Sequence, residues 1–145
     1  MVQPVLFSHT LNVFTLRASR TATLAAIAAV LAGCAGYGGS GPAAPAATQD
    51  GVLVGTVNQM SLYTFDRDPA GGGKSVCNGP CATNWPPLKA EASSLPMGDW
   101  SVITRDDGAK QWAFKGKPLY FWIKDQKPGD RTGDGFNNVW HLARP

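Results

Sequence analysis

Cys77 and Cys81 are the pair of side chains in this sequence best suited to chemistry, and three residues separate them. In an oxidising compartment an isolated cysteine pair tends to bridge, so the first prediction is a structural disulfide. The alternative is a metal-handling or redox role, because soft thiolates select Cu(I). The candidates for a further copper ligand are Met60, Met97 and His141. A c-type haem site is excluded, because Ala82 follows Cys81 where such a site needs histidine.

A second candidate site lies in the Asp-rich and Gly-rich segment near the C-terminus. Asp130, Thr132 and Asp134 stand at alternate positions before Gly135, like the first half of a calcium-binding loop. The bidentate glutamate that should close such a loop is replaced by His141. We therefore interpret the segment as a surface turn, with a weak calcium site as the alternative.

His141 is the one histidine that remains once an N-terminal signal carrying His9 is removed. A hydrolase would need His141 as its base, and the sequence has no Gly-x-Ser-x-Gly elbow to accompany it. The sequence also has no P-loop, no dinucleotide-binding fingerprint and no His-Glu-x-x-His motif. We predict that the protein is not an enzyme and that it carries no cofactor and no metal.

Residues 1–33 are predicted to be an export signal, with Arg17 and Arg20 before a short apolar run. The segment Leu31-Ala32-Gly33-Cys34 resembles the lipobox of bacterial lipoproteins, in which the cysteine is acylated and becomes the new N-terminus. The resemblance implies a membrane anchor on Cys34 that does not span the bilayer. In a Gram-negative host, Ala35 after that cysteine would direct the protein to the outer membrane, facing the periplasm.

Residues 34–50 form the predicted lipidated end and flexible tether, since the stretch is rich in Ala, Gly, Pro and Ser. Without Arg17 and Arg20 the chain has 11 basic and 10 acidic side chains, so no nucleic-acid partner is expected. The loose group of Lys115, Lys117, Lys124 and Lys127 is interpreted as protection of a sheet edge.

From Gly51 to Pro145 short apolar runs alternate with turn residues, which predicts a small all-β domain. The six predicted strands are residues 52–57, 62–65, 100–105, 111–114, 119–123 and 139–142. Asp106-Asp107-Gly108 and Lys115-Gly116-Lys117 are predicted hairpin turns, because glycine supplies the positive φ of tight turns. Residues 100–123 should therefore form a three-stranded meander.

The pattern Leu-Tyr-x-aromatic-x-x-Asp occurs twice, 57 residues apart, and a tryptophan follows each copy. The motif residues are Tyr63, Phe65 and Asp68 in the first copy and Tyr120, Trp122 and Asp125 in the second. Trp85 and Trp140 end the two units. Two such units predict a pseudo-symmetric antiparallel domain in which neither half can bury its aromatic face alone.

Alternate residues of a strand share a face, so Tyr63 and Phe65 lie on one side and Leu62 on the other. Both faces are then apolar, which favours a strand packed between two layers. Each aspartate follows its strand and is placed to accept a backbone N–H or a tyrosine hydroxyl and so to order the turn. The alternative is a pair of aromatic platforms for a ligand.

The lipobox, the tandem motif and Cys77-x-x-x-Cys81 before Trp85 together resemble the bacterial predicted lipoproteins with a Yx(FWY)xxD motif, a secreted-repeat family of unknown function. The resemblance covers residues 51–145 and carries no established activity. It implies mainly a location and a fold. We predict a cell-envelope lipoprotein that acts as a non-catalytic binding or structural module, with an envelope protein or a small ligand as partner. The alternative is a periplasmic metal-handling or redox accessory protein that uses Cys77 and Cys81.

Overall fold

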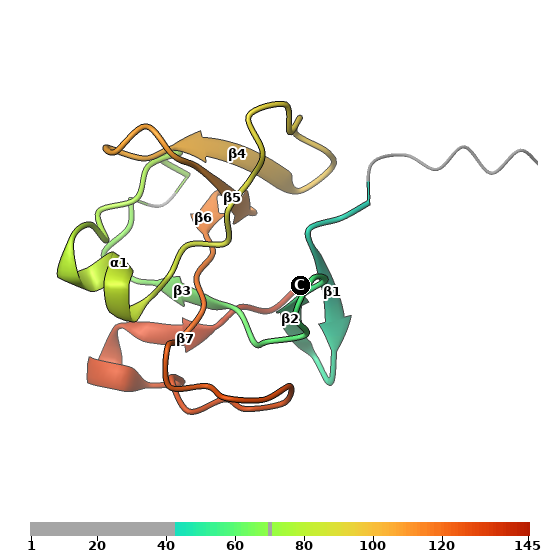
Figure 1. Ribbon diagram of the computed structural model, residues 1–145, viewed down its shortest axis with the longest axis vertical. Coiled ribbons are helices and arrows are strands. Elements are labelled where there is room, and N and C mark those ends of the chain that lie inside the picture. The colour runs from blue at the N-terminus through green and yellow to red at the C-terminus, as the bar shows by residue number, and fades with distance from the viewer. Residues whose placement is uncertain (1–42, 70) are drawn as a thin grey trace, which may run out of the picture. The chain divides into compact units, whose positions relative to one another are not determined.

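The computed structural model describes residues 43–69 and 71–145, which form short antiparallel strands with little helix (Figure 1). This confirms the predicted all-β fold class. The strands are β1 (Ala46–Gln49), β2 (Val52–Gly55), β3 (Tyr63–Phe65), β4 (Trp100–Thr104), β5 (Lys110–Phe114), β6 (Lys117–Pro118) and β7 (Trp140–Leu142). The helical turns are α1 (Pro80–Asn84) and η1 (Phe136–Asn138).

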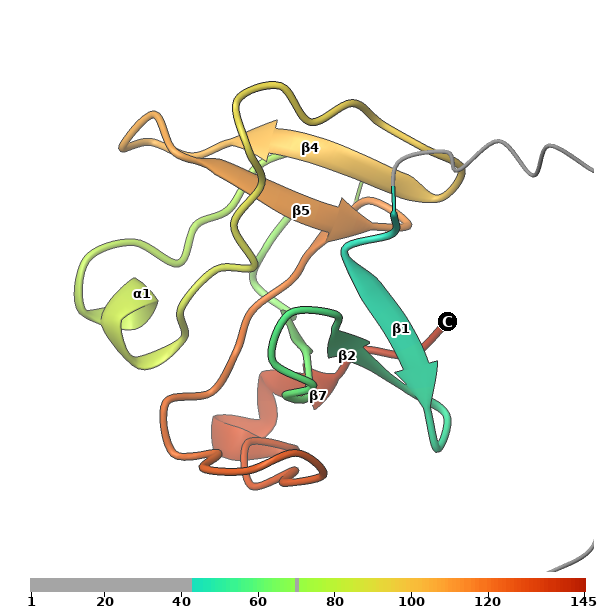
Figure 2. The same ribbon diagram turned by 45° about the vertical axis from the view of Figure 1, so that its right-hand side comes forward.

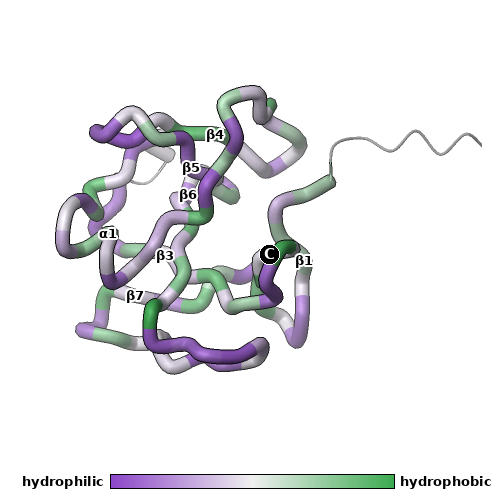
Figure 3. Tube along the Cα trace, in the orientation of Figure 1, coloured by the Kyte–Doolittle hydropathy of each residue, from purple (hydrophilic) through white to green (hydrophobic). Residues whose placement is uncertain are grey.

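The predicted export signal, Cys34 and residues 35–42 of the predicted tether lie outside the described residues. Within the described part, no helix is long and apolar enough to cross a membrane. Figure 3 shows that the loop after Ile123 is mostly hydrophilic, in keeping with its Lys, Asp and Gly content.

The tether was predicted to extend to residue 50, and this boundary is wrong. Residues 46–49 form β1, which pairs with β2 in a hairpin that stands beside the β4–β5 hairpin in Figure 2. Asp50 and Gly51 both have positive φ, 49° and 74°, which is the geometry of a two-residue type I′ turn. Ala46 is buried, so the strand belongs to the domain although its composition resembles a linker.

The predicted meander is present as the sheet β4–β5–β6, but its third strand is Lys117–Pro118 and not residues 119–123. Residues 119–121 bond to three different neighbours, so no continuous ladder forms there. The Leu119 N–H donates to Trp112, the Tyr120 N–H to Tyr63, and the Phe121 N–H to Pro86. A crossing of this kind keeps the segment extended without making it a strand.

Tyr63 and Tyr120 mark the centre of a pseudo-two-fold arrangement. The backbone N–H of each tyrosine donates to the carbonyl oxygen of the other, at 2.8 and 3.0 Å. Two further pairs of backbone bonds are related by the same symmetry. The Ala143 N–H donates to Leu62 O, as the Leu88 N–H donates to Leu119 O. The Leu53 N–H donates to Ala143 O, as the Trp112 N–H donates to Leu88 O. The end of each unit therefore pairs with the motif segment of the other unit, and β3 pairs with β7 in this way.

The two faces of the motif segments enter two separate clusters of the core. Tyr63 and Tyr120 are fully buried in the cluster that also holds the tryptophans of the two unit ends. Leu62 and Leu119 are buried in the second cluster, against the hairpin residues. Each motif segment thus lies between two apolar layers, and burial of large aromatic side chains contributes most of the stabilisation.

Candidate functional site

The two motif aspartates bind the tyrosine hydroxyl of the opposite unit. The Tyr63 hydroxyl donates to the Asp125 carboxylate at 2.6 Å, and the Tyr120 hydroxyl donates to the Asp68 carboxylate at 2.6 Å. Both tyrosines are fully buried. These crossed pairs explain why the motif needs an aromatic ring that carries a hydroxyl, because a buried hydroxyl without a partner is costly.

The second carboxylate oxygen of each aspartate orders the loop of its own unit. In the first unit Asp68 accepts the backbone N–H of Val76 at 2.8 Å, just before the cysteine pair. In the second unit Asp125 accepts both the N–H and the hydroxyl of Thr132, at 3.0 and 2.6 Å. Each aspartate therefore ties its own loop to the other unit's motif segment.

A buried arginine extends the network around Tyr120. Arg105 donates to the Ser75 hydroxyl at 2.9 Å and to the Gln111 side-chain oxygen at 2.6 Å. Ser75 in turn bonds to the Tyr120 hydroxyl at 2.7 Å. Arg105 also donates to the Cys77 carbonyl, so the guanidinium holds the disulfide loop against the domain. Arg105 Nε has no hydrogen-bond partner among the described residues.

Burial shifts the ionisation of the crossed pairs. It raises the pKa of both Tyr63 and Tyr120 well above the ordinary value, and the neighbouring carboxylate acts in the same direction. Burial also raises the pKa of the Asp68 carboxyl, although the Tyr120 hydroxyl, the Val76 N–H and the Arg105 charge oppose that rise. The tyrosines therefore stay protonated as donors across the neutral range, which suits a structural role.

The tryptophans of the two unit ends stack on the pseudo-two-fold axis. Trp85 and Trp140 are 3.8 Å apart between ring centroids and nearly parallel, and Trp122 and Phe65 extend the stack on either side. Gly133 is required beside this stack, because a Cβ there would lie 2.7 Å from Trp85. The four rings of the stack are thus engaged with one another, which is core packing and not a pair of open platforms.

Cys77 and Cys81 form a disulfide, as predicted. Cys77 is fully buried, and Cys81 packs against the same aromatic cluster. Because both sulfurs are in the bridge, the pair offers no thiolate to a metal while the bridge is intact. The bridge closes the loop that Asp68 and Arg105 hold from the other side.

The Asp130 and Asp134 carboxylates serve separate backbone groups. Asp130 accepts the N–H groups of Gln126 and Lys127, and these bonds lower the pKa of its carboxyl. Asp134 accepts the N–H of Leu142 at 3.0 Å. Among residues 43–69 and 71–145, no group of three or more His, Cys, Asp or Glu side chains comes together as a metal site.

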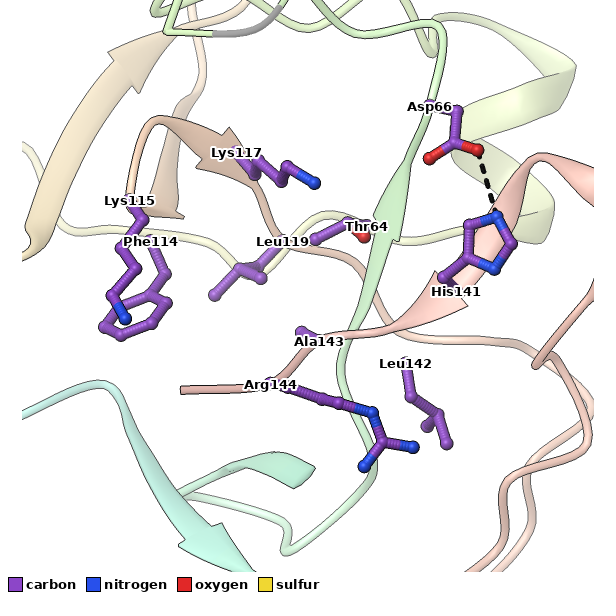
Figure 4. A pocket seen from close by; sticks show the side chains of 10 residues that line it. All are labelled: Thr64, Asp66, Phe114, Lys115, Lys117, Leu119, His141, Leu142, Ala143 and Arg144. Carbon is purple, nitrogen blue, oxygen red and sulfur yellow. Dashed lines mark hydrogen bonds and ion pairs between the residues drawn. The ribbon is translucent and has the colours of Figure 1, made fainter. Parts of the chain in front are cut away.

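A surface pocket of about 330 Å³ lies between β3, β6 and the C-terminal residues after β7 (Figure 4). Its lining residues are Thr64, Asp66, Phe114, Lys115, Lys117, Leu119, His141, Leu142, Ala143 and Arg144. Figure 4 shows Lys115 and Lys117 on one side of the pocket and the Asp66–His141 pair on the other. His141 is exposed, and its Nε2 lies 2.9 Å from the Asp66 carboxylate.

Neither the buried Arg105 network nor this pocket follows from the sequence. Arg105 closes a predicted strand and looks like any surface cation, and only the fold buries it under the disulfide loop. The pocket is formed by residues from three separate segments, so no local spacing could have revealed it. The sequence pattern around Lys115 and Lys117 indicates only the protection of a sheet edge.

Comparison with known proteins gives one family. The family described as a secreted repeat of unknown function matches residues 45–89 and again residues 101–144. No curated protein and no solved structure matches the chain. Each match covers the hairpin of one unit, its motif segment and the tryptophan that ends the unit. The first match begins at residue 45 and so includes the β1–β2 hairpin. The chain therefore belongs to the secreted-repeat family of unknown function, with two copies of the repeat.

Proposed function

We propose that this protein is a lipid-anchored, non-catalytic binding module of the cell envelope, held to a membrane by acyl chains on Cys34. Membership of a secreted-repeat family supports a location in the envelope or outside the cell. The lipobox-like segment before Cys34 supports the anchor. In a Gram-negative host the anchored domain faces the periplasm from the outer membrane.

The binding role is supported by one contrast: the polar groups of the two motifs are engaged in internal bonds, whereas a pocket on the surface is open. The motif carboxylates and hydroxyls that could act in catalysis are held in crossed internal bonds, and the cysteines are held in a bridge. The pocket beside β3 is instead open to solvent at five of its lining side chains, Asp66, Lys115, Lys117, His141 and Arg144. Binding sites of this kind sit on rigid scaffolds, because less conformational freedom is lost when the ligand binds.

The anchor is tested by expressing the full chain and its Cys34→Ala variant with a radiolabelled fatty acid. The account expects label and membrane association in the parent and neither in the variant. A Cys77→Ala, Cys81→Ala double variant is the matched cysteine control and should keep the label. Equal labelling of the parent and Cys34→Ala would contradict the anchor.

The binding role is tested by thermal unfolding of the full chain, extracted in detergent, against a panel of small anions, small cations and neutral sugars. A ligand that binds only the folded state raises the melting temperature as its concentration exceeds the Kd. The account expects a shift from at least one class, and expects Thr64→Phe, which fills the pocket, to abolish it. A panel that leaves the melting temperature unchanged throughout would overturn the binding role.

A further inference from the structure

We propose that the pocket between β3, β6 and the C-terminal residues binds a small organic anion, with its anionic oxygens beside Lys117 and Arg144 and its apolar body against Phe114. This inference rests on the proposed binding function and names its ligand class. Three observations support it. Three cations in the lining form no ion pair among the described residues, the corresponding position of the second repeat is filled by an aromatic ring, and the lining combines apolar and hydrogen-bonding side chains.

The pocket has more positive charge than its own residues neutralise. Lys115, Lys117 and Arg144 line it, and none of the three forms an ion pair within the part of the chain that the structure describes. The Asp66 carboxylate is the one acidic group in the lining, and it is turned to His141. Arg144 also donates to the Gly51 carbonyl oxygen at 3.3 Å, which leaves its charge unneutralised. Three cations beside one carboxylate that is held by His141 attract an anion, and charge-assisted hydrogen bonds strengthen that binding.

The second repeat closes the corresponding position with an aromatic ring. The two motif segments align without a gap, which makes Phe121 the counterpart of Thr64. The backbone bonds that equate Leu53 with Trp112 make Gly55 the counterpart of Phe114. Phe121 packs directly on Gly55, whose Cβ, if it had one, would lie 3.0 Å from the Phe121 ring. The first repeat has the small Thr64 instead, so the equivalent space stays open.

The residues around the two positions differ in the same sense. The partner of Thr64 across the sheet is His141, whereas the equivalent residue of the other repeat is Pro86. Asp66 likewise stands where the second repeat has Ile123. At these positions the second repeat is therefore filled and apolar, whereas the first repeat is open and has polar or charged side chains. A pocket that existed merely because the fold leaves a gap would occur in both copies.

The walls define the size and shape of the ligand. A volume of about 330 Å³ falls at the low end of the range for small-molecule sites. Phe114, Leu119 and Leu142 provide apolar contact, and the Thr64 hydroxyl and His141 provide hydrogen bonds beside the cations. This combination suits one planar or ring-shaped body with one carboxylate or phosphate group.

The probes are benzoate, phenyl phosphate, inorganic phosphate and the neutral benzamide, titrated calorimetrically into the full chain in detergent. Benzoate and phenyl phosphate should bind, and benzamide, which has nearly the shape of benzoate, should bind at least about tenfold more weakly. Inorganic phosphate has the anionic group without the ring, so it should bind more weakly than phenyl phosphate. Stronger binding of benzoate than phenyl phosphate would indicate a carboxylate ligand, and the reverse a phosphate ester.

Matched variants localise the binding. Arg144→Gln should weaken phenyl phosphate by about tenfold, whereas Lys89→Gln, at the counterpart position of the other repeat, should leave it unchanged. Thr64→Phe, which copies Phe121, should abolish binding while the melting temperature stays close to that of the parent. Equal binding of benzamide and benzoate, or equal effects of Arg144→Gln and Lys89→Gln, would overturn the anion site and leave a neutral-ligand module standing. No binding by any molecule in the wider panel would instead overturn the proposed function.

Discussion

Gln111 and Val52 occupy the same position of their hairpins, one residue before Trp112 and Leu53, and both are fully buried. Gln111 bonds to Arg105 and to the Leu119 carbonyl, so the core around Tyr120 is a polar network. Val52 packs in the apolar cluster around Tyr63. The same backbone arrangement thus supports two different interiors. We infer that the crossed Tyr–Asp bonds and the tryptophan stack define the fold, whereas the residues at neighbouring positions can differ between the repeats.

We name these two regions by their tyrosines. The Tyr120 site consists of Tyr120, Asp68, Ser75, Arg105 and Gln111. The Tyr63 site consists of Tyr63, Asp125, Thr132, Gly133 and Val52. The Tyr120 site connects to the disulfide loop through Arg105, whereas the Tyr63 site connects to the Gly-rich loop through Asp125.

The largest effect should come from removing either tyrosine ring, because this breaks what the two sites share. Tyr63→Ala and Tyr120→Ala should each lower the free energy of unfolding by about 3 to 5 kcal/mol, as large aromatic truncations in cores do. Urea unfolding measures the loss. If both variants unfold like the parent, the tyrosines are not core residues and the shared frame is wrong.

Removal of the disulfide should separate the two sites. Cys77→Ala with Cys81→Ala should cost about 2 kcal/mol, near the low end for disulfides, because the closed loop is short. Hydrogen exchange should show faster exchange at Val76, in the loop held at the Tyr120 site, and unchanged exchange at Thr132. Uniform acceleration at both amides would mean that the loop is not a local element.

Removal of the hydroxyl alone should affect the Tyr120 site more than the Tyr63 site. Tyr120→Phe removes the bond to the Asp68 carboxylate and the bond to the buried Ser75 hydroxyl, and should cost about 2 kcal/mol. Tyr63→Phe removes the bond to Asp125, which keeps both bonds from Thr132, and should cost about 1 kcal/mol. Thermal unfolding of the two variants ranks them, and a reversed order would contradict the difference between the sites.

The smallest effects should appear in the pH dependence of unfolding. Because the folded-state pKa of Asp68 is raised, its contribution is fully present below about pH 4 and is lost as pH rises through that pKa. The pKa of Asp130 is lowered, so its contribution is present above about pH 4 and is lost as pH falls through that lower pKa. Stability differences from the parent should therefore change with opposite sign in Asp68→Asn and Asp130→Asn. Slopes of one sign would contradict this assignment.

The tyrosines extend the same test to alkaline solution. Since the pKa of Tyr63 and of Tyr120 is raised, the stability that each contributes is present below about pH 10 and is lost as pH rises through the folded-state pKa. Tyr63→Phe and Tyr120→Phe should each flatten the fall in unfolding free energy above pH 10. An unchanged slope in both variants would show that the buried hydroxyls do not titrate with unfolding.

The repeated motif predicts the fold class and the buried motif segments, because the spacing of aromatic residues and turns is a local property. It does not show that each aspartate bonds to the opposite tyrosine, since two identical motifs carry no label that says which copy pairs with which. The predicted strand at residues 119–123 is absent for a related reason. Its composition suits a strand, but its backbone bonds go to three different segments instead of to one neighbouring strand. The β1 strand was missed because Ala46 and Ala47 resemble the linker before them.

The pocket was beyond prediction because it depends on a difference between copies. Thr64 gains significance only from the fold, in which it occupies the position in the first repeat that Phe121 occupies in the second. Arg144 and Lys117 are distant in sequence, and only the fold makes both of them line the pocket. A comparison of the two copies, position by position, was the one sequence signal that could have indicated it.

The most direct test of the account is a titration of the isotope-labelled full chain in detergent with phenyl phosphate, followed by backbone amide NMR. The account predicts shift changes at Thr64, Lys117 and Arg144, and none at their counterparts Phe121 and Lys89. Changes of equal size in both repeats would contradict the claim that divergence between the two copies has opened one of them to a ligand.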